Sequence, residues 1–327
     1  MDVLADILRG LRARDAFLLR TVLDPPWSIR VCDAAPLSVT TVVRGGAWVV
    51  PDSGGPVPLG PGDVAVLRGP DPYTVADAPD TPPQVVIHPD QRCTTLDGRD
   101  LSTVMALGLR TWGTRPDAAA ALLTGTYASS GAVGAGLLAA LPPLVVLRAD
   151  DGDLPVVALL AGELDRDEPG QEAVLDRLLD LLVIAVLRTW FARPGARAPG
   201  WYRAYPDPVV GRAVRLVQHD PAYPWTVAEL AAATGTSRAA FARRFTALVG
   251  EPPMAFVTGW RLALAAELLH DTELTVTAVA RRVGYGSPFA LSAAFKRVRG
   301  VSPRAHRVAA GTPAATEITP RGVGDRR

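Results

Sequence analysis

Basic side chains occur in both of two similar stretches of the chain, between residues 226 and 303, but at different positions of each. In the first stretch, Arg238 and Arg243 lie on the side of an expected helix that faces away from its apolar stripe. An arginine guanidinium can donate two parallel hydrogen bonds to one guanine in the major groove of DNA. The second stretch carries Lys296, Arg297 and Arg299, whose charges suit phosphate oxygens. These residues predict base reading by the first stretch and phosphate binding by the second.

The predicted DNA contacts comprise the serines that begin two helices and the outward-facing positions that follow them. They are Ser237, Arg238, Ala239, Ala242 and Arg243 in the first stretch, and Ser287, Phe289, Ser292, Lys296, Arg297 and Arg299 in the second. Phe289 has two interpretations, contact with a thymine methyl group or packing inside the domain. The competing interpretation of the arginines is that they only solvate a helix surface, which the duplication of the whole unit disfavours.

Each stretch predicts two helices joined by a tight turn. The corresponding residues are Thr226, Gly235, Ser237, Phe245, Gly250 and Pro253 in the first copy, and Thr275, Gly284, Ser287, Phe295, Gly300 and Pro303 in the second. The threonines and serines are expected to cap helix N-termini, with Glu229 completing a capping box. Each turn glycine allows the left-handed backbone that ends a first helix, and Pro288 suits the first position of its helix. Two such units are helix-turn-helix motifs.

The second helices need an apolar inner face, and a further helix must join the motifs. The inner faces are predicted at Phe241, Phe245 and Leu248 and at Leu291, Phe295 and Val298. Residues 254–269 predict the connecting helix, with an apolar stripe at Phe256, Trp260, Leu264 and Leu268. Its length of roughly 25 Å could place the two second helices in successive major grooves, about 34 Å apart.

Residues 207–308 resemble the DNA-binding domain of the AraC/XylS transcription regulators. The resemblance is carried by residues 225–231, 237–245, 249–254, 260–262, 283–285, 294–297 and 300–304. It assigns groove reading to Ala239, Ala242 and Arg243 in the first motif and to Phe289, Ala290 and Ala293 in the second. The family often carries a polar or basic residue where this chain has Ala293. The resemblance implies a sequence-specific DNA-binding transcription regulator.

The N-terminal part predicts a small β-structure. Short β-rich runs separated by Gly/Pro turns occur at residues 17–22, 28–31, 37–44, 47–50, 64–67, 73–75 and 84–87. Residues 27–30, 43–48 and 59–64 make this region similar to the cupin-like sensor domain that precedes the DNA-binding domain of some AraC-type regulators. We therefore expect an α+β protein, with a cupin-like barrel or jelly roll and flanking helices, followed by an all-α domain with two helix-turn-helix motifs and a linker helix.

Metal chemistry is not expected in the β-structure, because only His88 lies near the strands and one imidazole cannot build a two- or three-histidine site. No cofactor and no catalytic residue are predicted. The alternative function is a small-molecule-binding or metal-dependent cupin enzyme with an accessory DNA module, and a third is a non-specific architectural DNA protein. Cys93 lies close to His88 and Arg92, which could lower its pKa and make it a redox sensor; the alternative is an unreactive thiol.

The domain boundaries follow composition and charge. We expect a sensor and dimerisation domain at 1–192, a linker at 193–206, the DNA-binding domain at 207–310 and a disordered tail at 311–327. Residues 207–310 carry thirteen Lys and Arg against seven Asp and Glu, a net charge of +6, whereas residues 1–206 have −6. The helix predicted at 172–192 has an apolar stripe that belongs either to the core or to a dimer surface.

The partners expected from these features are double-stranded promoter DNA, a small-molecule effector and a second copy of the chain in a homodimer. RNA polymerase is a further candidate partner. The longest apolar run, residues 181–187, is too short to cross a bilayer, so no membrane contact is expected. Only two cysteines are present, which favours the reducing cytoplasm.

Overall fold

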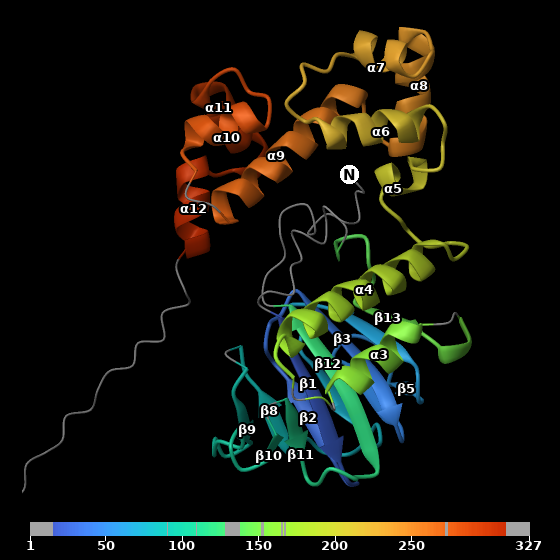
Figure 1. The fold of residues 1–327 in the computed structure, drawn as a ribbon, viewed down its shortest axis with the longest axis vertical. Coiled ribbons are helices and arrows are strands. Elements are labelled where there is room, and N and C mark those ends of the chain that lie inside the picture. Colours follow the sequence, from blue (N-terminus) through green and yellow to red (C-terminus); the bar gives the residue numbers. More distant parts are fainter. Residues whose placement is uncertain are drawn as a thin grey trace, which may run out of the picture. The chain divides into compact units, whose positions relative to one another are not determined.

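The computed structural model describes residues 16–89, 91–108, 110–127, 138–151, 154–164, 166, 168–271 and 274–311. The chain forms two compact units, Met1–Pro206 and Asp207–Arg327, and each is considered by itself. The first unit contains the strands and the second consists of helices (Figure 1). Among the described residues, no helix is both long enough and apolar enough to span a membrane.

The first unit is built on two sheets. The larger sheet has the order β10 (Ala106–Gly108), β11 (Thr111–Gly113), β1 (Ala16–Leu23), β12 (Ala120–Tyr127), β3 (Leu37–Arg44), β6 (Val64–Arg68), β13 (Leu144–Leu147). The smaller has the order β5 (Val57–Leu59), β4 (Ala47–Pro51), β7 (Tyr73–Ala76), β2 (Ser28–Val31), β8 (Val85–Ile87), β9 (Cys93–Thr95). Most neighbours are antiparallel, and β1–β11 and β2–β8 are parallel. The cupin-like part of the α+β prediction is thereby confirmed.

All seven strands predicted from the sequence are present, with ends that differ by at most one residue. The prediction missed β5 and β9 to β13, of which β12 matters most because it lies in the middle of the larger sheet. Seven of its eight residues are buried. A strand buried on both faces shows no alternation of apolar and polar residues, so its sequence lacks the signal of a half-buried strand.

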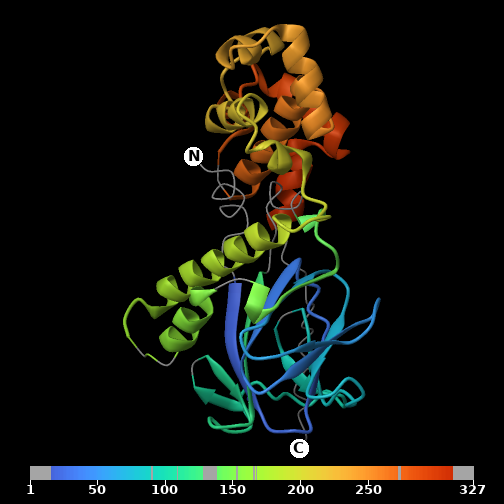
Figure 2. The same cartoon turned by 90° about the vertical axis from the view of Figure 1, so that its right-hand side faces the viewer.

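Two helices, α3 (Pro155–Leu164) and α4 (Gln171–Phe191), cover one face of the larger sheet (Figures 1 and 2). The inner side of α4 is buried at Leu175, Leu179, Leu182, Val183, Val186 and Leu187. Gly125 of β12 permits this packing, because a Cβ atom there would lie 2.5 Å from Cδ1 of Leu179. The predicted helix at 172–192 is therefore present, and its stripe contributes to the core.

The segment predicted as a linker is packed onto the first unit. It contains the short helix α5 (Gly200–Ala204), and the ring of Tyr202 lies 5.1 Å from that of Phe191 at the end of α4. Arg193 donates hydrogen bonds to the carbonyl of Val146, at 3.2 Å, and to the carboxylate of Asp151, at 2.5 Å. These contacts give residues 193–206 more structure than their Pro/Gly-rich composition suggests.

The second unit contains seven helices within the described residues. They are α6 (Val210–His219), α7 (Val227–Ala233), α8 (Arg238–Val249), α9 (Pro253–Asp271), α10 (Val276–Arg282), α11 (Pro288–Arg299) and α12 (Pro303–Gly311). The pairs α7–α8 and α10–α11 are the two predicted helix-turn-helix motifs, and α9 joins them. Residue 311, which was assigned to the tail, ends α12, and residues 312–327 lie outside the described residues.

Helix ends in the second unit follow the predicted capping chemistry. Thr226 and Glu229 form a reciprocal capping box, and Thr275 accepts a hydrogen bond from the backbone N–H of Ala278. Gly235 and Gly284 have φ values of 68° and 81°, so they adopt the left-handed conformation expected after α7 and α10. Local sequence is sufficient here because a cap depends on residues only three positions apart.

The inner faces of α8 and α11 agree with the prediction except at their last turns. Phe241, Phe245, Leu291 and Phe295 have no exposed surface. Val298, predicted to be buried, is 55% exposed. The predicted helix spacing was correct, but Val298 lies in the final turn of α11, where its side chain is not covered by the rest of the unit.

Candidate nucleic-acid interface

Helix α8 presents the residues predicted to read bases. Ser237 caps it by accepting a hydrogen bond from the N–H of Ala240, at 3.3 Å. Arg238, Ala239 and Arg243 are exposed and Ala242 is half-buried. Since the opposite side of α8 is held in the core by its two phenylalanines, the exposed side is presented on a fixed element.

Two neighbouring arginines of α8 differ in their surroundings. Arg244 donates hydrogen bonds to Asp207 through Nε at 3.2 Å and Nη2 at 2.7 Å. The same carboxylate accepts from the backbone N–H groups of Val209 and Val210 at the start of α6. Partial burial acts to raise the pKa of Asp207, but these hydrogen bonds prevail and lower it. Arg244, although exposed, therefore ties α8 to α6, and Arg243 has no such partner among the described residues.

Helix α11 presents a different surface. Ser287 caps it through the N–H of Ala290, at 3.1 Å, and Ser292 is half-buried. Phe289 is 84% exposed, so the interpretation that it packs inside the domain is wrong. Lys296 and Arg297 are exposed as well. The outer side of α11 thus combines one large apolar ring with two cations.

Arg299 differs from the other predicted phosphate ligands. It is half-buried, and its guanidinium carbon lies 6.0 Å from the centre of the Phe295 ring, which belongs to the core. Burial lowers the pKa of Arg299, although Glu267 acts in the opposite direction. A cation over an aromatic face stabilises the domain, so part of the role of Arg299 is structural.

The environment of Cys93 contradicts the expected activation of its thiol. Cys93 is 8% exposed, and burial together with the charge of Asp100 raises its pKa to about 11. The ring of His88 contacts a different side chain, since its Nε2 atom is 2.9 Å from Oγ1 of Thr94. The prediction of a lowered pKa was therefore wrong: proximity in sequence did not show that the thiol is buried in β9.

The two sheets of the first unit enclose a cavity of about 50 Å³. Its walls come from both sheets and include Leu19, Leu122, Ile29 and Val75, with the hydroxyls of Thr40 and Thr124 among them. Trp27 also lines the cavity, and its buried indole Nε1 has no hydrogen-bond partner among the described residues. The sequence could not indicate this site, because its residues are spread over six strands and their loops.

Strand β12 connects this cavity with α4. Leu122, Thr124 and Thr126 line the cavity, whereas the alternate residues Gly125 and Tyr127 face α4. Tyr127 is fully buried and donates a hydrogen bond to Asp180 of α4, at 3.5 Å. The two faces of one strand therefore line the cavity and contact the helix, respectively.

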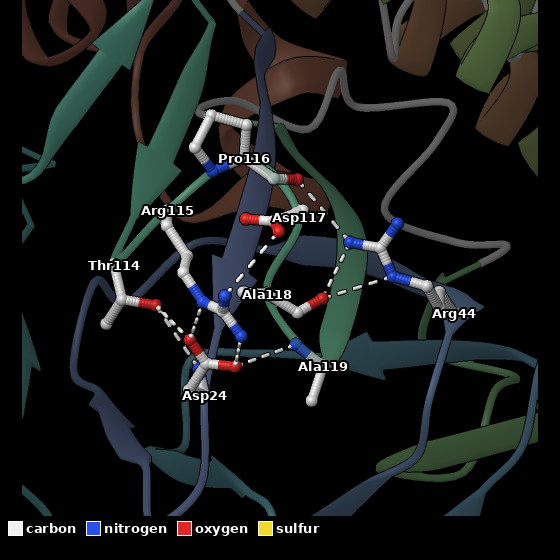
Figure 3. A network of polar contacts seen from close by, with 8 residues as sticks. All are labelled: Asp24, Arg44, Thr114, Arg115, Pro116, Asp117, Ala118 and Ala119. Carbon is white, nitrogen blue, oxygen red and sulfur yellow. Dashed lines mark hydrogen bonds and ion pairs between the residues drawn. The ribbon is translucent and has the colours of Figure 1, made fainter.

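A polar network fixes the approach to β12 (Figure 3). Asp24, which follows β1, accepts hydrogen bonds from Nε of Arg115, at 2.6 Å, and from the N–H of Ala119, at 3.0 Å. These two contacts, in that order, lower the pKa of Asp24 to about 2. Arg44 at the end of β3 donates to the carbonyl of Ala118. The loop before β12 is thus held from both neighbouring strands.

The chain matches two known protein families. A cupin family matches residues 2–192, which is more than half of the sequence. A helix-turn-helix domain matches residues 230–309. The matches fall on the strand-rich unit and on the helical unit that carries both motifs.

Several known proteins are similar to this chain. A Streptomyces lividans protein named as an AraC-like transcription regulator is 33% identical over 313 residues, covering 94% of this chain and 98% of the relative. The transcriptional regulator AlkR of Acinetobacter baylyi is 33% identical over 181 residues, 54% of this chain and 59% of AlkR. The crystal structure of the DNA-binding domain of AdpA with a target DNA is 36% identical, covering 32% of this chain and 92% of that one, with a TM-score of 0.31.

Proposed function

Because this chain belongs to the AraC-type transcription regulators, with a cupin domain before a helix-turn-helix domain, we propose that α8 and α11 bind one promoter duplex in different ways. In α8, Arg238 and Arg243 read bases, with Ser237, Ala239 and Ala242 against the groove. In α11, Lys296 and Arg297 bind phosphates and Phe289 touches a thymine methyl group, while Ser287 and Ser292 border the contact. Arg299 adds positive charge at the edge of the contact between α11 and the DNA.

The observation that carries this proposal is the contrast between Arg243 and Arg244. Both side chains are exposed on a helix that is capped and anchored, but the second is paired with Asp207, whereas the first has no such ion pair among the described residues. Base reading needs a guanidinium whose hydrogen bonds are not already used inside the protein.

The test compares binding of the whole chain to its own upstream region and to random DNA at matched salt, by fluorescence anisotropy. Specific binding should exceed non-specific binding by a factor of about a thousand or more. Equal affinity for both DNAs would instead support an architectural role, and the proposed base reading would be abandoned.

For the first unit we propose a non-enzymatic role as a sensor and dimerisation domain, within residues 1–192. The cavity supports it, because it combines apolar walls with hydroxyls and with an indole N–H that has no hydrogen-bond partner in the described part of the chain. It admits a small-molecule effector of only a few atoms, since one water-sized probe occupies about 10–15 Å³. Calorimetric titration with small polar and apolar compounds, compared with a variant in which Leu122→Trp fills the cavity, tests this: equal binding by both proteins would remove the cavity from the proposal.

The remaining proposals concern the chain as a whole. Residues 193–206 connect the sensor domain to the DNA-binding domain, which begins at 207 and extends to the end of α12 at 311. The protein acts as a homodimer in the cytoplasm, and RNA polymerase is its candidate partner at the promoter. Stoichiometric iron or zinc in the purified protein would contradict the non-enzymatic role of the cupin domain.

A further inference from the structure

The loop between α6 and α7 is tied to the connecting helix by one side chain. Arg261 of α9 donates a hydrogen bond from Nε to the carbonyl of Pro221, at 2.7 Å, and another from Nη2 to the carbonyl of Tyr223, at 2.6 Å. Charge-assisted hydrogen bonds of this length are among the stronger ones in proteins. A single guanidinium therefore bridges two carbonyls of the loop that leads into the first motif.

The turn of the second motif touches the same loop. Gly284 lies between α10 and α11, and a Cβ atom there would be 2.9 Å from the Cα and carbonyl oxygen of Ala222 and from the carbonyl oxygen of Pro221. Its φ of 81° also disfavours any other residue. Gly284 is thus needed both for the turn and for the close approach to the loop.

The loop itself has a defined shape. The carboxylate of Asp220 accepts a hydrogen bond from the N–H of Tyr223, at 3.1 Å, and the Asp220 carbonyl accepts one from Nε1 of Trp225, at 2.8 Å. The rings of Tyr223 and Trp225 are 4.3 Å apart. A loop whose shape is fixed in this way can hold the second motif at a defined position relative to the first.

We propose that Arg261 is a positioning residue that sets the separation at which α8 and α11 meet the DNA. It holds the loop that leads into the first motif against α9, and Gly284 of the second motif approaches the same loop. This inference rests on the proposed function, in which both helices bind one duplex. Arg261 itself does not need to contact DNA, since two of its donor groups are occupied by protein carbonyls.

Arginine is required for this role because its planar fork can donate to two carbonyls at once. Lysine keeps the charge, but it has a single nitrogen on a flexible stem. The two substitutions therefore separate positioning from simple charge: if Arg261 acted on phosphates, Arg261→Lys would retain most of its effect.

The experiment begins with selection of binding sites from a random duplex library by the whole wild-type chain. Hydroxyl-radical footprinting on the best selected site then shows the backbone contacts of both motifs. The variants are Arg261→Lys, Arg261→Gln and Gly284→Ala, which disturbs the same junction from its other side. Arg212→Gln is the matched control, since Arg212 is exposed on α6.

Wild type and Arg212→Gln should protect two backbone segments about one helical turn apart. Both Arg261 variants and Gly284→Ala should keep the protection by the first motif and lose or broaden that by the second. Affinity for the full site should fall at least about fivefold. Once the first motif is bound, the second motif is no longer held near its own segment, so its effective concentration there falls. Affinity for a duplex that contains only the first segment should change by less than about twofold, which also shows that the variants are folded.

Two sharply protected segments with Arg261→Gln, at the wild-type separation, would overturn the inference. Wild-type affinity retained by Arg261→Lys, but not by Arg261→Gln, would overturn it as well, in favour of a charge effect. Equal loss on the full site and on the first segment would show a general folding role and also reject positioning. If the wild-type chain selected no sequence, the proposed function would fail, and this inference with it.

Discussion

At the scale of single residues, the adjacent arginines Arg243 and Arg244 of α8 have different expected roles. Arg243→Ala should weaken specific binding by about 1–3 kcal/mol and relax the preference at one base pair, because it removes a bidentate base contact. Arg244→Ala should instead lower the thermal stability of the second unit, since it breaks the ion pair with Asp207 at 2.7 Å. Binding measured on a panel of single-base variants distinguishes the two. If Arg243→Ala weakened all DNAs alike, its role would be phosphate binding.

The buried thiol gives a second prediction at this scale. With a pKa of about 11, Cys93 should react very slowly with iodoacetamide near neutral pH, and its rate should rise as the pH approaches that value. At pH 8 only about one molecule in a thousand would carry the thiolate, which is the reactive form. Cys32, which is partly exposed, serves as the internal comparison when both sites are followed by mass spectrometry. Faster labelling of Cys93 than of Cys32 at pH 7 would contradict the buried environment.

At the scale of elements, the contact between β12 and α4 makes the position of one element depend on a single residue of another. Gly125→Ala should lower the free energy of unfolding by about 1–3 kcal/mol, because the added methyl group overlaps the Leu179 side chain. Adding Leu179→Ala to Gly125→Ala should cost less than Leu179→Ala alone costs in the wild-type background. Urea unfolding of the four proteins gives this coupling, and strict additivity would show that the methyl group is accommodated elsewhere.

Elements governed by neighbouring residues were predictable from the sequence, and those governed by distant ones were not. The capping box of Thr226 and Glu229 and the left-handed Gly235 depend on residues a few positions apart, so both helix-turn-helix motifs could be predicted. Strand β12 was missed because both of its faces are covered by segments distant in the sequence. The burial of Cys93 was missed for the same reason, and only the fold separates Arg243 from Arg244, through a partner 37 positions away.

At the scale of the whole molecule, the charge distribution and the proposed dimer predict opposite salt dependence. Residues 1–206 carry a net charge of −6 and residues 207–310 a net charge of +6. In a monomer, an acidic unit joined to the DNA-binding unit would reduce phosphate attraction, so the intact chain would depend on salt no more steeply than a fragment of residues 207–311. A dimer that places two second units on one duplex roughly doubles the phosphate contacts, and the slope of log affinity against log salt increases in proportion.

We therefore expect the slope for the intact chain to be about twice that for the fragment on the same selected site, because the slope counts neutralised phosphates. The measurement is fluorescence anisotropy of both proteins over a range of salt concentrations, with sedimentation to establish the mass of each complex. Lys296→Ala provides the calibration: it should reduce the fragment slope by about one unit and the slope of a dimer by about two. Equal slopes for fragment and intact chain would reject simultaneous binding by two copies, and the charge of the first unit would then account for any remaining difference in affinity.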